Sequence, residues 1–244
     1  MDLALTGKRA LITGGSSGLG LATAKALAEE GVEVIVASRN PERLQSTGLA
    51  YVVADVSKPD EVADLVRETT SRLGGIDILI ANAGGPPPGN FSSTPLDAYE
   101  TALRLNLTSI VSLCQAVVPG MREAKWGRII AITSYSVREP IAHLILSNTA
   151  RAGATAFLKT LSREIASDNI TVNTLQPGLH LTDRLAQLYP DQRAIDAAAM
   201  SVPARALGHP ADFGHVAAFL CSEHAKYITG VSIPVDGGAL HGLQ

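Results

Sequence analysis

Cysteine is scarce in this sequence. The only two cysteines, Cys114 and Cys221, are far apart, and each stands in an apolar helical context. This setting favours reduced packing residues over a disulfide or a metal-binding pair. Because lasting disulfides belong to oxidising compartments, the cysteine usage fits a cytoplasmic protein.

An excess of charge of one sign is also missing. Lys and Arg total 20 and Asp and Glu total 23, which gives a net charge of −3. Without a broad positive field, we expect no binding to nucleic acid or to anionic membrane. No apolar run reaches the roughly 18 residues that a membrane span needs, and the stretch before the first glycines is too short for a signal sequence. We therefore expect a soluble protein.

Repeats and linkers are absent as well. The 244 residues, 46% of them hydrophobic, are enough to bury one core of the size that an α/β sheet requires. We expect a single domain that covers residues 1–244.

Short β-branched apolar runs alternate with longer amphipathic stretches. Strands are predicted over Arg9–Ile12, Glu33–Ala37, Tyr51–Ala54, Asp77–Ala81, Gly127–Ser134, Thr171–Leu175 and Val231–Val235. Helices are predicted over Leu19–Glu29, Glu61–Leu73, Leu96 to about Glu123, about Ser147 to Ser167, and Ala211–Leu220. This alternation is typical of parallel strands joined by right-handed helical crossovers. The predicted fold is a Rossmann-type α/β domain, a doubly wound parallel sheet of about seven strands with helices on both faces.

Two segments interrupt the alternation. Gly84–Pro95 contains four prolines, and it predicts a loop that continues neither a helix nor a central strand. Residues 179–202 follow a strand end and are only weakly helical. We interpret them as a lid over a site at the carboxyl ends of the strands, although a surface excursion without a role fits the same pattern.

A glycine-rich loop, Thr13 to Gly20, lies between the first predicted strand and the first predicted helix. Glycines there allow a tight turn and a close approach to a pyrophosphate, whose charge is favoured by the N–H groups of a helix N-terminus. The position after a strand and before a helix therefore predicts phosphate binding. The residues assigned to it are Gly14, Ser16, Ser17, Gly18, Leu19 and Gly20.

The T-G-x-x-x-G-x-G arrangement of this loop resembles that of the short-chain dehydrogenase/reductase family. Further resemblances follow in the family's order along nearly the whole chain. They are Asp55-Val56 (an adenine contact), Asn82-Ala83-Gly84 (the N-A-G motif), Asn106 (the asparagine of a proton relay), Pro177-Gly178 with Thr182 (the nicotinamide carboxamide) and Ile228-Thr229-Gly230 with Asp236-Gly237-Gly238 (the C-terminal signature).

This resemblance, which is to 3-oxoacyl-ACP reductases in particular, carries several implications. It implies a nicotinamide cofactor, a small-molecule carbonyl or alcohol substrate, and assembly as a homodimer or homotetramer. His180 stands in the Pro-Gly-Leu-His turn, and it is a further candidate to touch the cofactor or the substrate.

The cofactor's identity is expected to be read at the end of the second strand. There an acidic residue accepts from a ribose 2′-hydroxyl, whereas a basic residue pairs with a 2′-phosphate. The residues here are Ser38 and Arg39, with no carboxylate. Because the arginine fork suits a phosphate, the pattern predicts NADP(H) in preference to NAD(H). An ordinary exposed loop arginine is the alternative.

The catalytic pattern of the family is broken. Ser134 stands in the place of the family's serine, but thirteen residues on, the place of its tyrosine holds Ser147. Four residues further, on the same helical face, Arg151 replaces the lysine. A serine hydroxyl is a far poorer acid than a tyrosine, which titrates near 10. Arg151 can donate hydrogen bonds to a ribose and provide a fixed charge, but its proton is not available for transfer.

Other groups are open as replacements for the missing acid. His143 shares the face of Ser147 if the helix has already begun there, and its ordinary pKa near 6.5 suits an acid. Tyr135 neighbours Ser134 but faces away if the strand continues with period two. Arg151 or Ser134 with a water would polarise a carbonyl without a dedicated acid, at a rate penalty on the order of 10² to 10⁴.

Three functions fit these observations. The first is an NADP(H)-dependent oxidoreductase with altered proton-donating groups. The second is an NADP(H)-binding sensor or partner subunit without redox catalysis, which the missing tyrosine and lysine favour and the retained Asn106 and Ser134 oppose. The third is a non-redox elimination or isomerisation, which some relatives with arginine in the lysine place resemble but which has no need of the phosphate loop.

Overall fold

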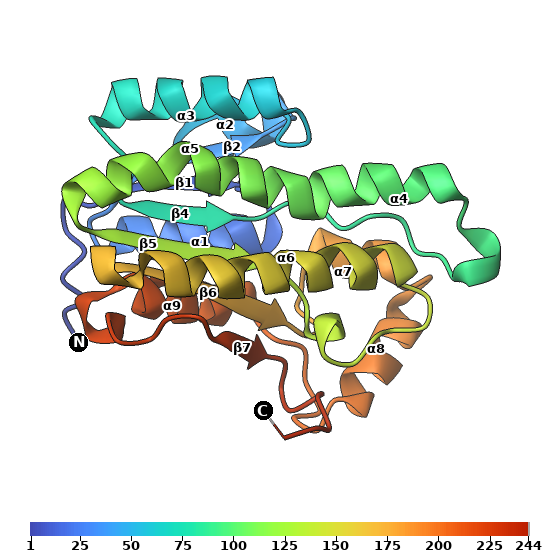
Figure 1. The fold of residues 1–244 in the computed structure, drawn as a ribbon. Helices are drawn as coiled ribbons and strands as arrows, with labels where there is room; N and C mark the ends of the chain where they lie inside the picture. Colours follow the sequence, from blue (N-terminus) through green and yellow to red (C-terminus); the bar gives the residue numbers. More distant parts are fainter. Residues whose placement is uncertain (244) are drawn as a thin grey trace.

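The computed structural model describes residues 1–243 and alternates strands with helices (Figure 1). The strands are β1 (Arg9–Thr13), β2 (Glu33–Ser38), β3 (Ala50–Val53), β4 (Ile78–Ala81), β5 (Gly127–Ile132), β6 (Ile170–Pro177) and β7 (Ser232–Val235). The α-helices are α1 (Gly18–Glu29), α2 (Pro41–Gln45), α3 (Pro59–Leu73), α4 (Leu96–Leu103), α5 (Ser109–Ala124), α6 (Ile145–Ile165), α7 (Asp183–Leu188), α8 (Gln192–Ser201) and α9 (Pro210–Cys221). A π-helical turn, η2 (Arg104–Thr108), joins α4 to α5, and four short 3₁₀ turns are η1 (Phe91–Ser93), η3 (Tyr135–Val137), η4 (Ala166–Asp168) and η5 (Glu223–Ala225).

The strands form one sheet in the order β3-β2-β1-β4-β5-β6-β7, and all neighbours are parallel. The chain winds outward from β1 to β3, returns to β4 beside β1, and then winds the other way to β7. The predicted doubly wound parallel sheet is therefore confirmed. In such sheets ligands bind outside the carboxyl ends of the strands where the winding reverses, which here is between β1 and β4.

Alternate residues of the central strands enter two separate cores. Leu11 and Leu79 lie on the face covered by α3, α5 and α6, whereas Ile12 and Ile80 lie on the face covered by α1 and α9 (Figure 1). This period of two is the geometry of a strand that is buried on both sides. The same strand ends are thus held rigidly from both faces, which fixes the positions of the loops that follow them.

The two cysteines lie in different cores. Cys114 of α5 belongs to the first core and Cys221 of α9 to the second, and both thiols are free and buried. Burial raises the pKa of each thiol to about 12. Both side chains are therefore protonated packing groups at neutral pH.

Two predicted boundaries, both near the carboxyl ends of the strands, differ from the structure. The strand predicted to reach Ser134 ends at Ile132, because Ser134 instead caps η3, its hydroxyl accepting a 3.1 Å hydrogen bond from the Ser136 N–H. The helix predicted from about Ser147 begins at Ile145. Residues 179–202 contain α7 and α8, which lie beyond the carboxyl ends of the strands (Figure 1).

One continuous helical stretch, Leu96–Ala124, is long and apolar enough to cross a membrane by length and composition alone, and 44% of its most apolar window is buried inside the protein. Its second half is α5, whose Leu113 and Val117 pack in the first core. Core helices of soluble proteins pass the same test, so one such helix is weak support for a membrane span.

Candidate active site

The glycine loop after β1 has no room for a side chain at Gly14, Gly15 or Gly20. Gly14 and Gly18 have φ values of +57° and +55°, in the left-handed region that favours glycine. A Cβ on Gly20 would lie 2.3 Å from the Gly14 carbonyl oxygen and 2.7 Å from Asn82 Nδ2. The close approach of loop and helix therefore depends on glycine at position 20.

Asn82 and Thr13 tie this loop to the end of β4. The Thr13 hydroxyl donates to the Asn82 carbonyl oxygen at 2.8 Å and accepts from the Asn82 N–H at 3.0 Å. The Asn82 side-chain amide donates to the Gly14 carbonyl oxygen at 3.1 Å. Three hydrogen bonds thus close the reversal point of the sheet beneath the loop.

The N-terminus of α1 is open above these contacts. Within the described chain, the N-cap residue Ser17 makes no side-chain capping bond and the first turn has no acidic residue. Thr182, at the start of α7, lies above the loop, with its methyl group 3.5 Å from where a Cβ on Gly18 would stand. Unsatisfied N–H groups at a helix N-terminus form a site for an anion, and Ser16 and Leu19 lie in the same loop and first turn.

The ends of β2 and β3 form the neighbouring part of the site. The Ser38 hydroxyl is buried and, among residues 1–243, has no hydrogen-bond partner. The Arg39 side chain is 72% exposed, and its guanidinium is 4.0 Å from Asp55. Burial raises the pKa of Asp55, but hydrogen bonds from Ser57 and the charge of Arg39 together lower it by more. The pKa of Asp55 therefore lies below its ordinary value. Val56, next in the chain, packs against the first core.

The segment after β6 forms the opposite wall. Gly178 donates from its N–H to the Val235 carbonyl oxygen at 2.9 Å, and a Cβ on Gly178 would lie 2.7 Å from the Asp236 Cα. Pro177 and Gly178 are thereby fixed against the end of β7. The chain then turns toward Thr182 and the glycine loop.

On the other side of β4, Asn106 points to the same strand ends. It lies in the π-helical turn η2 and is 2% exposed. Its amide donates to the Gly84 carbonyl oxygen at 3.1 Å, whereas its Oδ1 is buried and has no partner in the part of the chain that the structure describes. An unpartnered buried acceptor indicates a place for a water or a ligand donor.

Arg151 is buried under the ends of β4 and β5. Its guanidinium donates to the carbonyl oxygens of Ile132 at 2.8 Å, Thr133 at 3.1 Å and Ala83 at 3.4 Å. Burial, with the nearby charge of Arg184, lowers the pKa of Arg151 to about 10, so the group stays charged at neutral pH. Ser147, one helical turn earlier, is also buried, at 7% exposure.

Comparison with known proteins shows the family to which this chain belongs. The family described as Enoyl-(Acyl carrier protein) reductase matches residues 14–240. The 3-oxoacyl-(acyl-carrier-protein) reductase FabG of Vibrio cholerae is 36% identical over 96% of this chain and 98% of its own length. Dehydrogenase/reductase SDR family member 4 of Sus scrofa is 34% identical over 96% of this chain and 88% of its own length.

The chain belongs to the short-chain dehydrogenase/reductase family. A solved structure agrees: the L-sorbose reductase of Gluconobacter frateurii, complexed with NADPH and L-sorbose, superimposes with a TM-score of 0.93 at 32% identity, and the match covers 100% of both chains. The relatives are oxidoreductases, and this chain is an enzyme of the same family.

Three residues considered from the sequence take positions that the family pattern did not predict. His143 is exposed and precedes α6, which starts at Ile145, so the condition under which it would share a helical face with Ser147 is not met. Tyr135 lies in the 3₁₀ turn η3 rather than in an extended strand, so the period-two argument against it does not apply. Burial raises the pKa of Tyr135.

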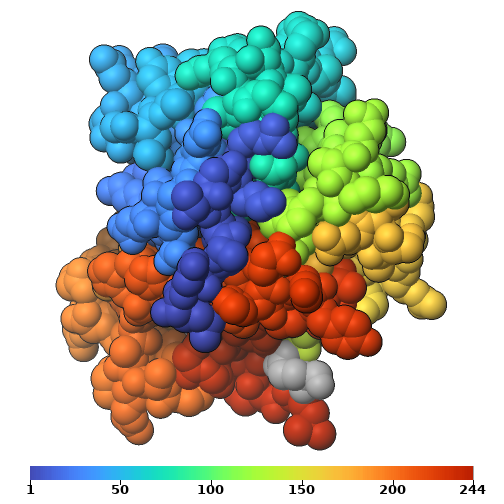
Figure 2. Space-filling view, turned by 90° about the vertical axis from the view of Figure 1, so that its left-hand side faces the viewer, coloured from blue at the N-terminus to red at the C-terminus, as the bar shows by residue number. Residues whose placement is uncertain are grey.

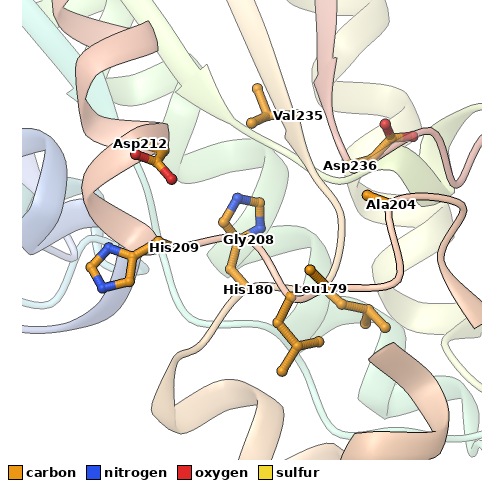
Figure 3. Close-up of a pocket in the computed structure, with 11 residues that line it drawn as sticks. Leu179, His180, Ala204, Gly208, His209, Asp212, Val235 and Asp236 are labelled. Atoms are coloured by element: carbon orange, nitrogen blue, oxygen red, sulfur yellow. The ribbon is translucent and has the colours of Figure 1, made fainter. Parts of the chain in front are cut away.

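His180 is the third. Its ring packs edge-on against Phe213 of α9, with centroids 5.4 Å apart, and its Nδ1 is 3.2 Å from the Gly178 carbonyl oxygen. Figure 3 shows the ring in a pocket between α9 and the end of β7. Burial lowers its pKa. The ring therefore packs against α9 at the wall of this pocket, and contact of His180 with the cofactor or the substrate stays a prediction.

Arg184 of α7 is the functional candidate that the sequence did not reveal. Its guanidinium donates to the Pro86 carbonyl oxygen at 2.8 Å, and a Cβ on Gly85 would lie 2.9 Å from the same nitrogen. It therefore connects residues 179–202 to the proline-rich loop after β4. The only sequence signal was a basic residue two positions after Thr182, which means little until the path of the chain is known.

Proposed function

We propose that this protein is an NADP(H)-dependent oxidoreductase that acts on a carbonyl or alcohol substrate. The observation that carries the proposal is the N-terminus of α1, which has no side-chain cap, above Gly14 and Gly20, where a Cβ would clash with neighbouring atoms. This cradle fits a pyrophosphate. The L-sorbose reductase with the same fold was solved with NADPH, which supports the same class of cofactor here.

NADP(H) is proposed in preference to NAD(H). The buried, unpartnered hydroxyl of Ser38 and the exposed guanidinium of Arg39 lie together at the end of β2. A 2′-phosphate would accept from both groups. The other residues proposed to hold the cofactor are Gly14, Ser16, Ser17, Gly18, Leu19, Gly20, Asp55, Val56, Asn82, Ala83, Gly84, Arg151, Pro177, Gly178, His180 and Thr182.

The bound cofactor would supply or accept a hydride, and the chain's own residues would manage the charge on the substrate oxygen. Ser134 and Ser147 are the hydroxyl donors proposed for that oxygen, and Arg151 is a fixed positive charge next to them. The free Oδ1 of Asn106 would hold a water. Because serine is a poor acid, the proton would come from water or from a further group rather than from Ser147 itself.

Three further expectations belong to this proposal. Residues 179–202 act as a lid, because Thr182 and Arg184 contact the glycine loop region and the loop after β4. The assembly is a homodimer or homotetramer, as the family resemblance implies. The protein works in the cytoplasm on a small molecule, which fits its two free buried cysteines.

Calorimetric titration with NADPH and NADH at fixed salt tests the cofactor assignment. We expect NADPH to bind at least about tenfold more tightly, a difference of about 1.4 kcal/mol, and Arg39→Asp to erase that preference. Arg67→Asp, the same charge change at an exposed arginine of α3, is the matched control and should keep it. Equal affinities in the natural protein would show that Arg39 does not read the phosphate.

A turnover screen over ketones and alcohols separates this function from its rival. The rival is an NADP(H)-binding sensor or partner subunit without redox catalysis, and the replacement of the tyrosine and lysine by Ser147 and Arg151 favours it. NADPH oxidation with any carbonyl substrate supports the oxidoreductase. Tight NADPH binding without turnover of any compound supports the sensor.

A further inference from the structure

Two guanidinium groups bracket one short segment at the centre of the site. Arg151 from α6 donates to the Ala83 carbonyl oxygen at 3.4 Å, and Arg184 from α7 donates to the Pro86 carbonyl oxygen at 2.8 Å. Both groups thus reach residues 83–86, which follow β4. Burial is the main cause of the lowered pKa of Arg151, and the positive charge of Arg184 lowers it further.

Neither guanidinium has a carboxylate counter-charge. The ion pairs found among residues 1–243 include neither Arg151 nor Arg184. Arg151 is bonded to backbone carbonyls, and Arg184 has Gln187 as its other neighbour, at 3.5 Å. Bringing two like charges together away from water is unfavourable unless an anion compensates them. Arg184 is partly exposed to solvent and Arg151 is bonded to backbone carbonyls, but the described chain supplies no anion for either charge, and a ligand carboxylate would supply one.

The position of the pair indicates what that ligand is. Arg151 is one helical turn from Ser147, on the same face of α6, and its carbonyl partner Thr133 immediately precedes Ser134. The unpaired charge is therefore next to the hydroxyls proposed to act on the substrate oxygen. Arginine forks bind carboxylates with two parallel hydrogen bonds.

We propose that Arg184 and Arg151 bind a carboxylate of the substrate, so that the protein acts on an oxo acid or the corresponding hydroxy acid. This inference rests on the proposed oxidoreductase function, because it assigns the substrate class of that site. The cofactor's own phosphates carry the same oxyanion chemistry, and Thr182, near the glycine loop, is only two residues from Arg184. The experiment therefore has to separate the two sources.

The test is calorimetric titration of the NADPH-loaded protein with oxamate and with phenylacetate, each compared with its uncharged amide. We expect at least one acid to bind and its amide to bind at least tenfold more weakly. Arg184→Met should weaken binding of the acid at least tenfold, and Arg184→Lys should retain part of it and report on folding. Arg163→Met, at an exposed arginine of the same helix as Arg151, is the control and should change nothing.

Three results would overturn the inference. The first is acids that bind no more tightly than their amides. The second is Arg184→Met binding the acid as well as the natural protein does. The third is a tenfold loss of NADPH affinity in Arg184→Met without added acid, which would assign Arg184 to the cofactor's phosphates. Titration of the cofactor-free protein with the same acids keeps this test independent of NADPH binding. If the protein does not bind NADPH at all, the proposed function is refuted instead.

Discussion

The two ends of the sheet differ in whether a buried arginine has a carboxylate partner. At the amino end, Arg128, the second residue of β5, is 0% exposed, and its guanidinium lies 3.3 Å from the Glu223 carboxylate. The centroid of the Trp126 ring is 4.3 Å from the guanidinium carbon. At the carboxyl end, Arg151 bonds to the last carbonyl of the same strand and has no carboxylate within the described residues. One strand thus has a neutralised arginine at its start and an uncompensated one at its end.

The same contrast holds for other groups at the two ends of the sheet. At the amino end Arg9 and Asp77 form two hydrogen bonds of 2.8 Å across β1 and β4, and the N-terminal segment covers that side, its Asp2 carbonyl 2.8 Å from a His224 ring nitrogen (Figure 2). At the carboxyl end the buried polar atoms of Ser38 and Asn106 have no partner within residues 1–243, and at the amino end Nε of the otherwise paired Arg128 guanidinium shares this state. Paired groups stabilise the fold, whereas unpaired groups retain hydrogen-bonding capacity for a ligand.

The largest loss of NADPH affinity is expected from a single methyl group added to the glycine loop. In Gly20→Ala the new Cβ would meet the Gly14 carbonyl oxygen at 2.3 Å, so the loop has to move and NADPH affinity should fall at least about 100-fold, about 2.7 kcal/mol. Gly120→Ala is the matched control, since it adds the same methyl group inside α5 with no heavy atom within 4 Å. It should leave the affinity unchanged and raise stability by about 0.5–1 kcal/mol. Unchanged NADPH binding by a folded Gly20→Ala protein would contradict the assignment of this loop.

A gain of activity is expected when the family's acid is restored. The double change Ser147→Tyr with Arg151→Lys places a tyrosine beside Ser134 and Asn106, and it should raise the turnover of a test ketone by about 10- to 1000-fold. Each single variant is the control. Rapid turnover by the natural protein that Ser147→Ala does not slow would mean that another acid serves, and His143→Ala and Tyr135→Phe would then be compared.

The turn of the glycine loop was predictable because its constraints are local. A strand followed by glycines and a helix specifies a turn that excludes side chains, and the positive φ of Gly14 and Gly18 follows from the same few residues. The parallel, doubly wound sheet was likewise predictable, because alternating periodicities and right-handed crossovers leave few topologies. The structure agrees with the sequence interpretation in the glycine turn and in the parallel sheet.

The reacting half was less predictable because its contacts join distant segments. From the sequence Arg151 can donate to a ribose, but its contacts with carbonyl oxygens at the ends of two strands were not foreseen. The ring of His180 turns toward Phe213, 33 residues away in the chain, and Arg184 reaches Pro86 across 98 residues. No local pattern encodes these directions, since they depend on how residues 179–202 pass over the sheet.

At the amino end of the sheet, removal of the counter-charge of Arg128 should reduce stability and leave NADPH binding unchanged. Glu223→Gln takes the carboxylate from Arg128 and from the Trp126 indole N–H. Because Glu223 is 38% exposed and solvent screens the pair, we expect a loss of about 1–2 kcal/mol in the free energy of unfolding, measured with urea. Glu164→Gln, at an exposed pair with Arg122, should cost under about 0.5 kcal/mol. A changed NADPH affinity in Glu223→Gln would remove the distinction between the two ends.

The smallest effect is expected where the C-terminal tail rests on the loop after η3. Glu139 accepts hydrogen bonds from the His241 N–H at 2.7 Å and the Gly242 N–H at 3.1 Å, and its other oxygen is 3.0 Å from the His241 ring. The bond and charge of His241 lower the pKa of Glu139, and the bond and charge of Glu139 raise that of His241. The carboxylate's contribution is present above its unfolded pKa and is lost as pH falls through the lowered folded value. The histidine's contribution is complete below its unfolded pKa and is lost as pH rises through the raised folded value.

The tail should therefore be held most firmly between those two folded pKa values. Hydrogen exchange of the His241 and Gly242 amides, corrected for the intrinsic pH dependence, should be slowest in that window. It should accelerate modestly above the window, because both backbone bonds to the carboxylate survive deprotonation of the ring. Glu139→Gln should abolish the pH dependence, and the change should stay small because the His241 side chain is 90% exposed. Protection that is constant across the window in the natural protein would show that the ion pair contributes nothing beyond the two backbone bonds.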